Sequence, residues 1–205
     1  RFLEVLSDGE PAPFRNGSGR LELARAITEQ AAPLTARVMV NRIWLAHFGR
    51  GLVTTPSNFG VQGDRPSHPE LLDDLAARFV DNGWSLKSLH REIVTSATYR
   101  QSNRSTSDSA DKDPDNRWLS RRERRRLDFE AWRDAMLAAS GTLDDAVGGP
   151  SIELDAPENR RRTLYATIHR RDMSTTLLTH DFPDPATHSP ARTSTTTPLQ
   201  GLYAL

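Results

Sequence analysis

The sequence predicts a mainly α protein: an irregular multi-helix bundle with long loops and at most a small β element near residues 162–169. Three observations support this fold class. Apolar residues recur with the 3.6-residue period of amphipathic helices over most of residues 21–141. Proline and glycine stand where such helices begin and end. Only "RTLYATIH", residues 162–169, alternates and carries β-branched residues as a strand does.

Residues 1–20 are rich in turn formers and are interpreted as a linker or extended lead-in. A short helix is expected from Leu21, and a longer one over residues 33–49. In the longer one, Pro33 suits the first turn and Gly49 suits a C-terminal cap. The glycine- and proline-rich residues that follow, up to Pro66, predict a loop.

The stretch "SHPE", residues 67–70, raises the choice between an acid–base or metal site and a helix start. Ser67 and Glu70 have the spacing of a capping box, with Pro69 in the first turn. This predicts a helix that runs to Gly83, and a further helix over residues 86–101 capped by Ser85. The start of a helix explains Ser67, Pro69 and Glu70. It leaves the role of His68 unexplained.

The second half is less periodic. Residues 102–115 are polar without one large apolar residue, which predicts an exposed excursion and makes them the candidate domain boundary. Neither side offers a convincing core alone, so we expect one domain over residues 21–205. A helix is predicted through residues 122–140, one helical turn near Leu177, and a last helix from Pro198.

Composition excludes several classes of function. The chain has 205 residues, 26% of them charged, a formal net charge of zero and no cysteine. It therefore holds no disulfide, thiol nucleophile or covalently attached haem c. No apolar run approaches the roughly 20 residues of a membrane span. The chain does not begin with Met and its first residues resemble no signal peptide, so we expect a piece of a larger protein.

The basic cluster "RRERRR", residues 121–126, does not indicate nucleic-acid binding. It includes Glu123, has no interleaved aromatic residue, and lies in a chain without net positive charge. The i, i+4 spacing of Arg126 and Glu130 predicts a salt-bridged helix instead.

An ordered series of blocks resembles a known family. The blocks are "VNRIWLAHFGRGLVTTPSNFGVQGDRPSHPELLDDLAARFV", "GWSLKSLHREIVTSATYRQS", "DPDNRWLSRRERRRLDFEAWRDAMLAASGTLD", "GGPS", "RRTLYA" and "TTTPLQGL". Together they resemble the planctomycete-specific domain of unknown function that typically follows cytochrome-c-like modules in large exported proteins. The resemblance implies an exported, periplasmic or envelope-associated location and a haem c module upstream of this piece. It implies no catalytic residues.

The densest polar set of the resembling region contains the weak catalytic candidates His47, Asp64 and His68. Two alternatives stay open for them. They converge in a pocket, or they bond loop carbonyls and hold irregular backbone. The neighbouring Arg42 and Asn58 are candidate binding residues.

Two further groups carry candidate roles. His180, Asp181 and Asp184 are weak candidates for a metal site in a loop, although loop carboxylates also cap turns. Ser and Thr residues at 193–198 suit either sugar hydroxyls or the cap of the last helix. Arg117, Trp118 and Arg121 form a predicted docking patch, since Trp and Arg are common interface anchors.

Two classes of function therefore remain. The first is an auxiliary interaction module whose partners are other modules of the parent protein, such as its cytochrome-c-like domain, or a surface polysaccharide. The alternative is an enzyme domain acting on polysaccharide, with carboxylates and histidines drawn from loops. No cofactor, nucleic-acid partner or membrane span is expected in this piece.

Overall fold

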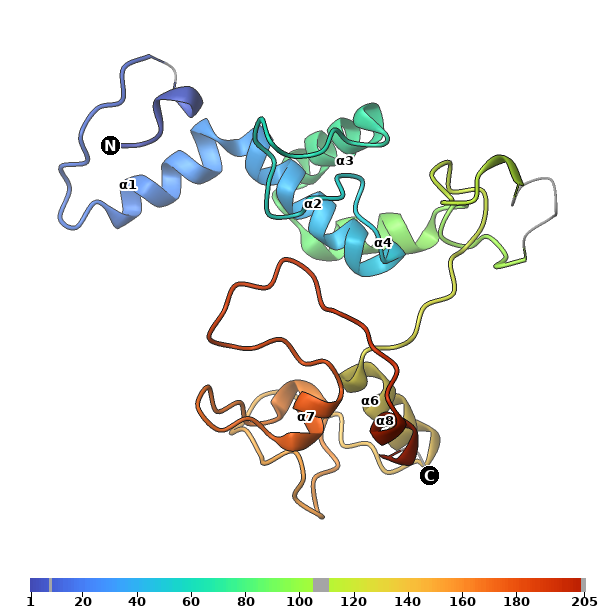
Figure 1. The fold of residues 1–205 in the computed structure, drawn as a ribbon. Helices are drawn as coiled ribbons and strands as arrows, with labels where there is room; N and C mark the ends of the chain where they lie inside the picture. The colour runs from blue at the N-terminus through green and yellow to red at the C-terminus, as the bar shows by residue number, and fades with distance from the viewer. Residues whose placement is uncertain (8, 105–110, 204–205) are drawn as a thin grey trace. The chain divides into compact units, whose positions relative to one another are not determined.

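A computed structural model describes residues 1–7, 9–104 and 111–203, and it confirms a mainly α fold (Figure 1). The chain forms two compact units, Arg1–Arg124 (unit 1) and Arg125–Leu205 (unit 2). The division falls beyond the polar segment 102–115, of which residues 105–110 lie outside the described residues. That the two units act as one domain stays a prediction.

Unit 1 begins with a 3₁₀ turn, Glu4–Leu6, and the helix α1, Arg20–Arg25, which continues into a π-helical turn, Ala26–Gln30. The long helix α2, Ala32–Phe48, follows. It ends as predicted at Gly49, whose φ of 80° is left-handed and whose N–H donates to the Leu45 carbonyl at 2.8 Å. Glycine adopts this conformation without steric cost.

The helices α3, Pro69–Asp81, and α4, Leu86–Thr95, pack on α2. Their apolar faces enclose the core of unit 1 together with the loop that follows α2. The buried core residues are Ala36, Val40, Ile43, Trp44, Phe48, Leu52, Val53, Leu72, Leu75, Ala76, Phe79, Leu89 and Ile93.

The junction between α3 and α4 confirms two predicted ends. Gly83 is left-handed at φ 66°, and the Trp84 N–H donates to the Phe79 carbonyl at 2.9 Å. The Trp84 ring then packs against the Phe79 ring, with centroids 5.3 Å apart. Ser85 caps α4 by accepting a hydrogen bond from the Ser88 N–H at 3.3 Å.

The predicted capping box at Ser67 is wrong. The N-cap of α3 is His68, and no side chain caps this end. The backbone N–H of Ser67 is tied to the Leu52 carbonyl at 2.8 Å, and its hydroxyl bonds His68 Nδ1 at 2.9 Å. Ser67 therefore lies one residue too early to satisfy the helix amides. Glu70 keeps its place in the first turn, where its charge suits the helix dipole.

Unit 2 contains α6, Phe129–Ala139, the 3₁₀ turn Thr163–Tyr165, α7, Thr175–Thr179, and α8, Pro198–Tyr203. The predicted strand at 162–169 reduces to the 3₁₀ turn and one isolated bridge, Ile152 to Ala166; a second bridge joins Asp144 to Arg161. The buried apolar core is small and consists of Phe129, Leu154 and Leu177.

The helix predicted from residue 122 begins only at Phe129, so the salt-bridged helix over 121–126 is wrong. The arginines there have partners that a helix would not allow. Arg122 donates to the His47 carbonyl at 2.9 Å, and Arg126 donates to the Thr195 carbonyl at 2.6 Å. Glu130 pairs with Arg192 instead of Arg126.

Polar side chains hold the loops of unit 2. Arg133 donates to the carbonyls of Asn159 at 2.8 Å and Arg161 at 3.0 Å. Arg161 donates in turn to the carbonyl of Pro150 at 3.0 Å. The Asp134 carboxylate accepts from both the N–H and the hydroxyl of Thr163 at 2.7 Å. These bonds satisfy backbone groups that no helix or sheet pairs.

Candidate functional site

Polar side chains of α2 and of the loop after it form hydrogen bonds that fix the irregular backbone of this loop. Asn41 is fully buried, and its amide exchanges two hydrogen bonds with Val53, donating to the carbonyl at 3.0 Å and accepting from the N–H at 2.8 Å. A Cβ on Gly51 would lie 2.8 Å from Asn41 Oδ1 and 2.4 Å from the Val53 oxygen. The Asn41 amide therefore pairs the Val53 N–H and carbonyl as a neighbouring strand would. Position 51 must be glycine because a Cβ there has no room.

Asn58 and Asp64 bond within the same loop. The Asn58 side chain accepts from the Gly60 N–H at 3.1 Å. The Asp64 N–H donates to the Thr55 hydroxyl at 3.0 Å, and its carboxylate accepts from the Thr54 hydroxyl. These contacts match the structural alternative for both residues. Arg42 is exposed on α2.

His47 and His68 have different neighbours. His47 Nε2 lies 2.7 Å from His90 Nδ1, and its ring meets the Tyr99 ring edge-on at 5.6 Å. His68 bonds Ser67 and meets the Trp118 ring edge-on at 6.2 Å. His47 and His68 thus contact different rings, and the catalytic role of His47, Asp64 and His68 stays a prediction. Sequence spacing gave no indication of His90 as a partner.

The segment 113–119, here the Trp118 loop, is braced from inside. Asp113 is only 8% exposed, and its two carboxylate oxygens accept from the N–H groups of Arg117 at 2.7 Å and Trp118 at 2.8 Å. Asn116 is left-handed at φ 49° and donates to the Arg121 carbonyl at 2.8 Å. Trp118 itself is 69% exposed. Buried polar groups thus fix a loop that carries a large aromatic side chain in solvent.

The predicted docking residues divide between two tasks. Arg121 braces the loop, because its guanidinium donates to the carbonyls of Asp113 at 2.9 Å and Pro114 at 2.7 Å. Arg117 accompanies the exposed ring, with its guanidinium carbon 6.0 Å from the Trp118 centroid. A small hollow beside the loop is lined by Arg50, Arg117 and Leu119 among others.

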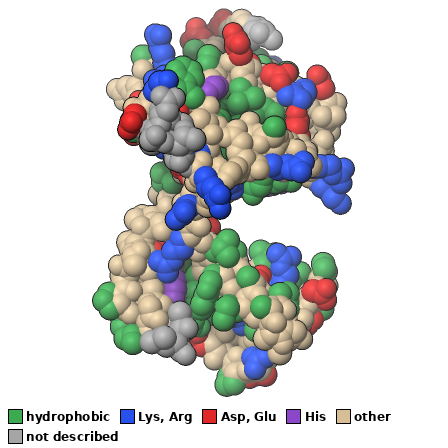
Figure 2. All heavy atoms as spheres, turned by 90° about the vertical axis from the view of Figure 1, so that its right-hand side faces the viewer, with side chains coloured by type: hydrophobic (Ala, Val, Ile, Leu, Met, Phe, Trp, Pro, Cys, Tyr) green, Lys and Arg blue, Asp and Glu red, His purple; other side chains and the backbone are tan. Residues whose placement is uncertain are grey.

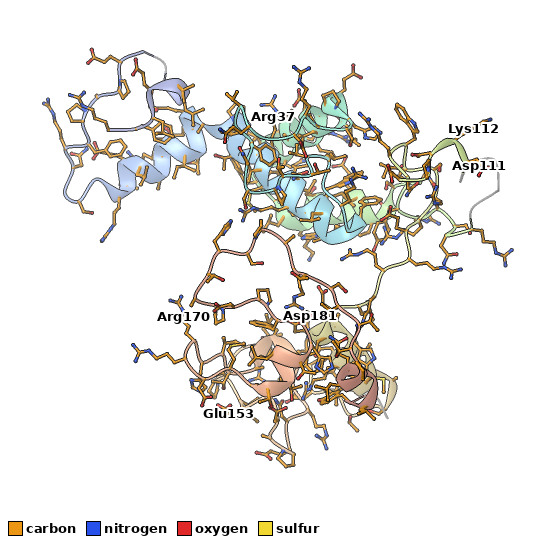
Figure 3. All side chains as sticks on the ribbon, viewed as in Figure 1. Arg37, Asp111, Lys112, Glu153, Arg170 and Asp181 are labelled. Carbon is orange, nitrogen blue, oxygen red and sulfur yellow. The ribbon has the colours of Figure 1, made fainter. Side chains whose placement is uncertain are left out.

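The three metal candidates of unit 2 serve separate contacts. Asp184 accepts from the Ala186 N–H at 2.8 Å, as a turn carboxylate does. Asp181, labelled in Figure 3, accepts from the N–H and the hydroxyl of Thr195 at 2.9 and 2.6 Å. His180 Nδ1 lies 2.7 Å from the Thr176 carbonyl. Within the described ranges, no three His, Asp or Glu side chains are grouped to hold a metal ion.

A cavity of about 180 Å³ opens beside His180, here called the unit 2 cavity. Gln200 is 4% exposed and organises its wall by donating to the Thr179 carbonyl at 2.9 Å and accepting from Arg126 at 2.8 Å. Sequence reasoning paired Arg126 with Glu130 on a helix and assigned no role to Gln200, although Gln200 lies in the block "TTTPLQGL". The cavity is lined by Arg126, Leu127, Asp128, Phe129, Trp132, His180, Asp181, Arg192, Thr193, Ser194 and Gln200.

The carboxylates near the cavity are held in their charged form. Burial alone would raise the pKa of Asp181, but the hydrogen bonds from Thr195 and Gln200 and the charge of Arg126 outweigh it and lower the pKa. Burial likewise opposes ionisation of Glu130, whose pKa is lowered by the two hydrogen bonds from Arg192, each 2.6 Å long. Neither group is suited to donate a proton at neutral pH.

Comparison with known proteins gives one match. A family model described as PSD1, protein of unknown function (DUF1553), matches residues 19–205. The chain belongs to this family. No curated protein and no solved structure matches it. The DUF1553 match extends over both units, and its description names no activity. Among the described helices, none combines the length and the apolarity needed to cross a membrane.

Proposed function

We propose that this chain is an interaction module that docks onto another folded protein module through Trp118. The observation that carries the proposal is the pairing of a 69% exposed tryptophan with a loop fixed by buried Asp113 and Asn116. Burying such a ring removes apolar area from water, and the cost of ordering the loop is already met in the free protein. Tryptophan and arginine are the residues most often found at the energetic centre of interfaces.

The chemistry around Trp118 specifies the partner surface. Arg50 and Arg117 are exposed and line the hollow beside the Trp118 loop. An apolar socket with an acidic rim would complement them. The face displayed in Figure 2 carries both basic and acidic side chains, and the chain has no formal net charge, which favours a protein surface over a polyanion such as nucleic acid.

We propose the partner from the resemblance of the sequence blocks to the planctomycete-specific domain. We place the chain in a large exported planctomycete protein, at the periplasm or cell envelope, after a cytochrome-c-like module. That module, which holds haem c outside this chain, is the proposed partner of Trp118. The Asn58 side chain bonds within its own loop, and a binding role for Arg42 and Asn58 stays a prediction separate from this contact.

An enzyme acting on polysaccharide is the alternative. Glycoside hydrolysis requires a carboxylic acid that is protonated at working pH and a second carboxylate facing it. Asp181 and Asp128 both line the unit 2 cavity, but the lowered pKa of Asp181 makes it a poor acid. The docking proposal therefore has the better physical support.

The test is a titration of the 205-residue chain with the purified cytochrome-c-like module of the same parent protein, followed by calorimetry. We expect binding, and we expect Trp118→Ala to weaken it by about thirtyfold, the effect of a hot spot of roughly 2 kcal/mol. Val61→Ala, at a fully exposed apolar position of the same unit, is the matched control.

Two results would overturn the proposal. The first is equal affinity of the Trp118→Ala variant and the original chain. The second is no association at high micromolar concentration. Hydrolysis of a polysaccharide by the isolated chain, lost on Asp181→Asn, would instead establish the enzyme.

A further inference from the structure

We infer that the unit 2 cavity binds a single uncharged sugar ring. This inference is independent of docking through Trp118, because all the residues that line the cavity belong to unit 2. It rests on four properties of the cavity: an aromatic wall, an unused hydrogen-bond acceptor, compensated charge and a volume suited to one ring.

The wall of the cavity is aromatic on one side. Phe129 and Trp132 line it from α6, with ring centroids 6.0 Å apart. His180 lies against Phe129 at 4.4 Å and against Tyr203 at 4.8 Å. An aromatic ring in this wall packs against the C–H face of a pyranose while leaving the ring hydroxyls to polar partners.

His180 supplies the acceptor. Its side chain lines the cavity and the residue is only 8% exposed. Nδ1 must donate to the Thr176 carbonyl, since a carbonyl only accepts, and in the neutral ring this leaves Nε2 as an acceptor. Nε2 makes no hydrogen bond to the residues that the structure describes. An acceptor at the cavity wall that the described residues leave without a hydrogen bond favours a ligand that brings a hydroxyl group.

The charges around the cavity are already paired. Arg192 forms a bidentate ion pair with Glu130, and the charge of Arg126 stabilises ionised Asp181. No arginine in this wall therefore stands without a carboxylate near it, and an anionic ligand would meet no uncompensated positive charge. Polar groups with balanced charge favour a neutral polyhydroxylated ligand.

The Ser and Thr segment contributes hydroxyl groups. Thr193 and Ser194 line the cavity, whereas Thr195 and Thr197 bond Asp181 and the Gln200 backbone. Residues 193 and 194 are thus available for sugar hydroxyls, whereas Thr197 caps the last helix. The volume of about 180 Å³ is below the roughly 300–1,000 Å³ of sites for drug-sized ligands, so one ring fits and a long chain does not.

The experiment is saturation-transfer NMR and tryptophan fluorescence on the 205-residue chain with methyl α-D-glucopyranoside, methyl β-D-galactopyranoside and methyl α-L-fucopyranoside. Glucuronate and inorganic phosphate serve as charged probes. We expect saturable, millimolar binding of at least one neutral glycoside, and weaker binding of both anions. His180→Phe keeps an aromatic ring in the wall and removes both ring nitrogens, Nε2 included, so it should weaken binding by about tenfold.

Two further variants separate the site from the fold. Ser194→Ala removes one lining hydroxyl at an exposed position and should weaken binding without loss of stability. His169→Phe, a change of the same type at an exposed residue outside the cavity lining, should leave binding unchanged. Failure of every neutral glycoside to bind, equal or tighter binding of the anions, or unaltered binding by both His180→Phe and Ser194→Ala would each overturn the inference.

Discussion

The two units solve the same problem by different means. In unit 1, three helices bury an apolar core, and polar side chains serve mainly one loop. In unit 2, the buried apolar core within residues 125–203 consists of Phe129, Leu154 and Leu177. Arginine, aspartate and glutamine side chains there bond the backbone carbonyls and N–H groups of the loops. The difference teaches that a sequence of ordinary composition can be ordered by hydrogen bonds where hydrophobic periodicity is weak.

The largest expected effect tests the apolar side of this comparison. Leu72 is 2% exposed in the core of unit 1. Leu72→Ala should lower the free energy of unfolding of unit 1 by about 3 kcal/mol, since it removes buried methyl groups and leaves a cavity. Urea denaturation followed by the helical circular dichroism signal measures this. Leu86→Ala, at a position 46% exposed, is the control and should cost much less.

The polar side of the comparison is tested at Arg133. Arg133→Met keeps the aliphatic stem and removes the donors to Asn159 and Arg161. The loss should be about 2 kcal/mol, because carbonyls that the guanidinium satisfied are left without a donor. Hydrogen exchange of residues 159–163 should accelerate, while that of α2 and α3 stays unchanged. An equal effect of Arg170→Met, at an exposed arginine, would remove the distinction.

Ion pairs should also differ between the units. Arg192 lowers the pKa of Glu130, although burial opposes this. The ion pair therefore stabilises unit 2 at pH values above the ordinary glutamate pKa. This stabilisation is lost as the pH falls through the lowered pKa of Glu130. Glu130→Gln should cost about 1.5 kcal/mol at neutral pH and nothing in strong acid. Denaturation curves recorded over a pH series measure this.

The matched pair in unit 1 is Arg37 with Asp73, on α2 and α3, of which Arg37 is labelled in Figure 3. The hydrogen bond from Arg37 lowers the pKa of Asp73, but the Asp73 side chain is 55% exposed. Asp73→Asn should therefore change stability by less than about 0.5 kcal/mol at any pH. A larger acid-dependent loss here than at Glu130 would reverse the comparison.

The last comparison concerns two helix starts within unit 1. Ser85→Ala should destabilise α4 by about 1 kcal/mol, because it removes an observed cap. Ser67→Ala should stay within about 0.5 kcal/mol, because its hydroxyl bonds only His68. Equal losses in thermal denaturation would restore the capping box that the spacing predicted.

The accuracy of the sequence predictions follows the same division. The bounds of α2, the left-handed Gly49 and Gly83 and the Ser85 cap were predicted because periodicity and caps are local properties. The start of α6 was wrong because the partners of Arg122 and Arg126 lie far away in the sequence.

The candidate sites depended on distant partners even more. Trp118 is 69% exposed, as a docking residue must be, while its role in docking stays a prediction. Nothing local links His47 to His90, Asn41 to Val53, or Gln200 to Thr179. A hydrogen bond between residues far apart imposes no periodicity on the chain, so the unit 2 cavity had no sequence pattern by which it was predictable.

The Asn41 amide beside Gly51 has a consequence for inheritance. A side chain at Gly51 would collide with the amide, and an apolar residue at 41 would strand the Val53 N–H and carbonyl. Replacing Asn41 at the same time would not admit a side chain at position 51, because the atom nearest to the added Cβ is the Val53 backbone oxygen at 2.4 Å. In a descendant chain we therefore expect glycine to be retained at 51, and a side chain with both a donor and an acceptor to be retained at 41, unless the backbone of the turn itself changes.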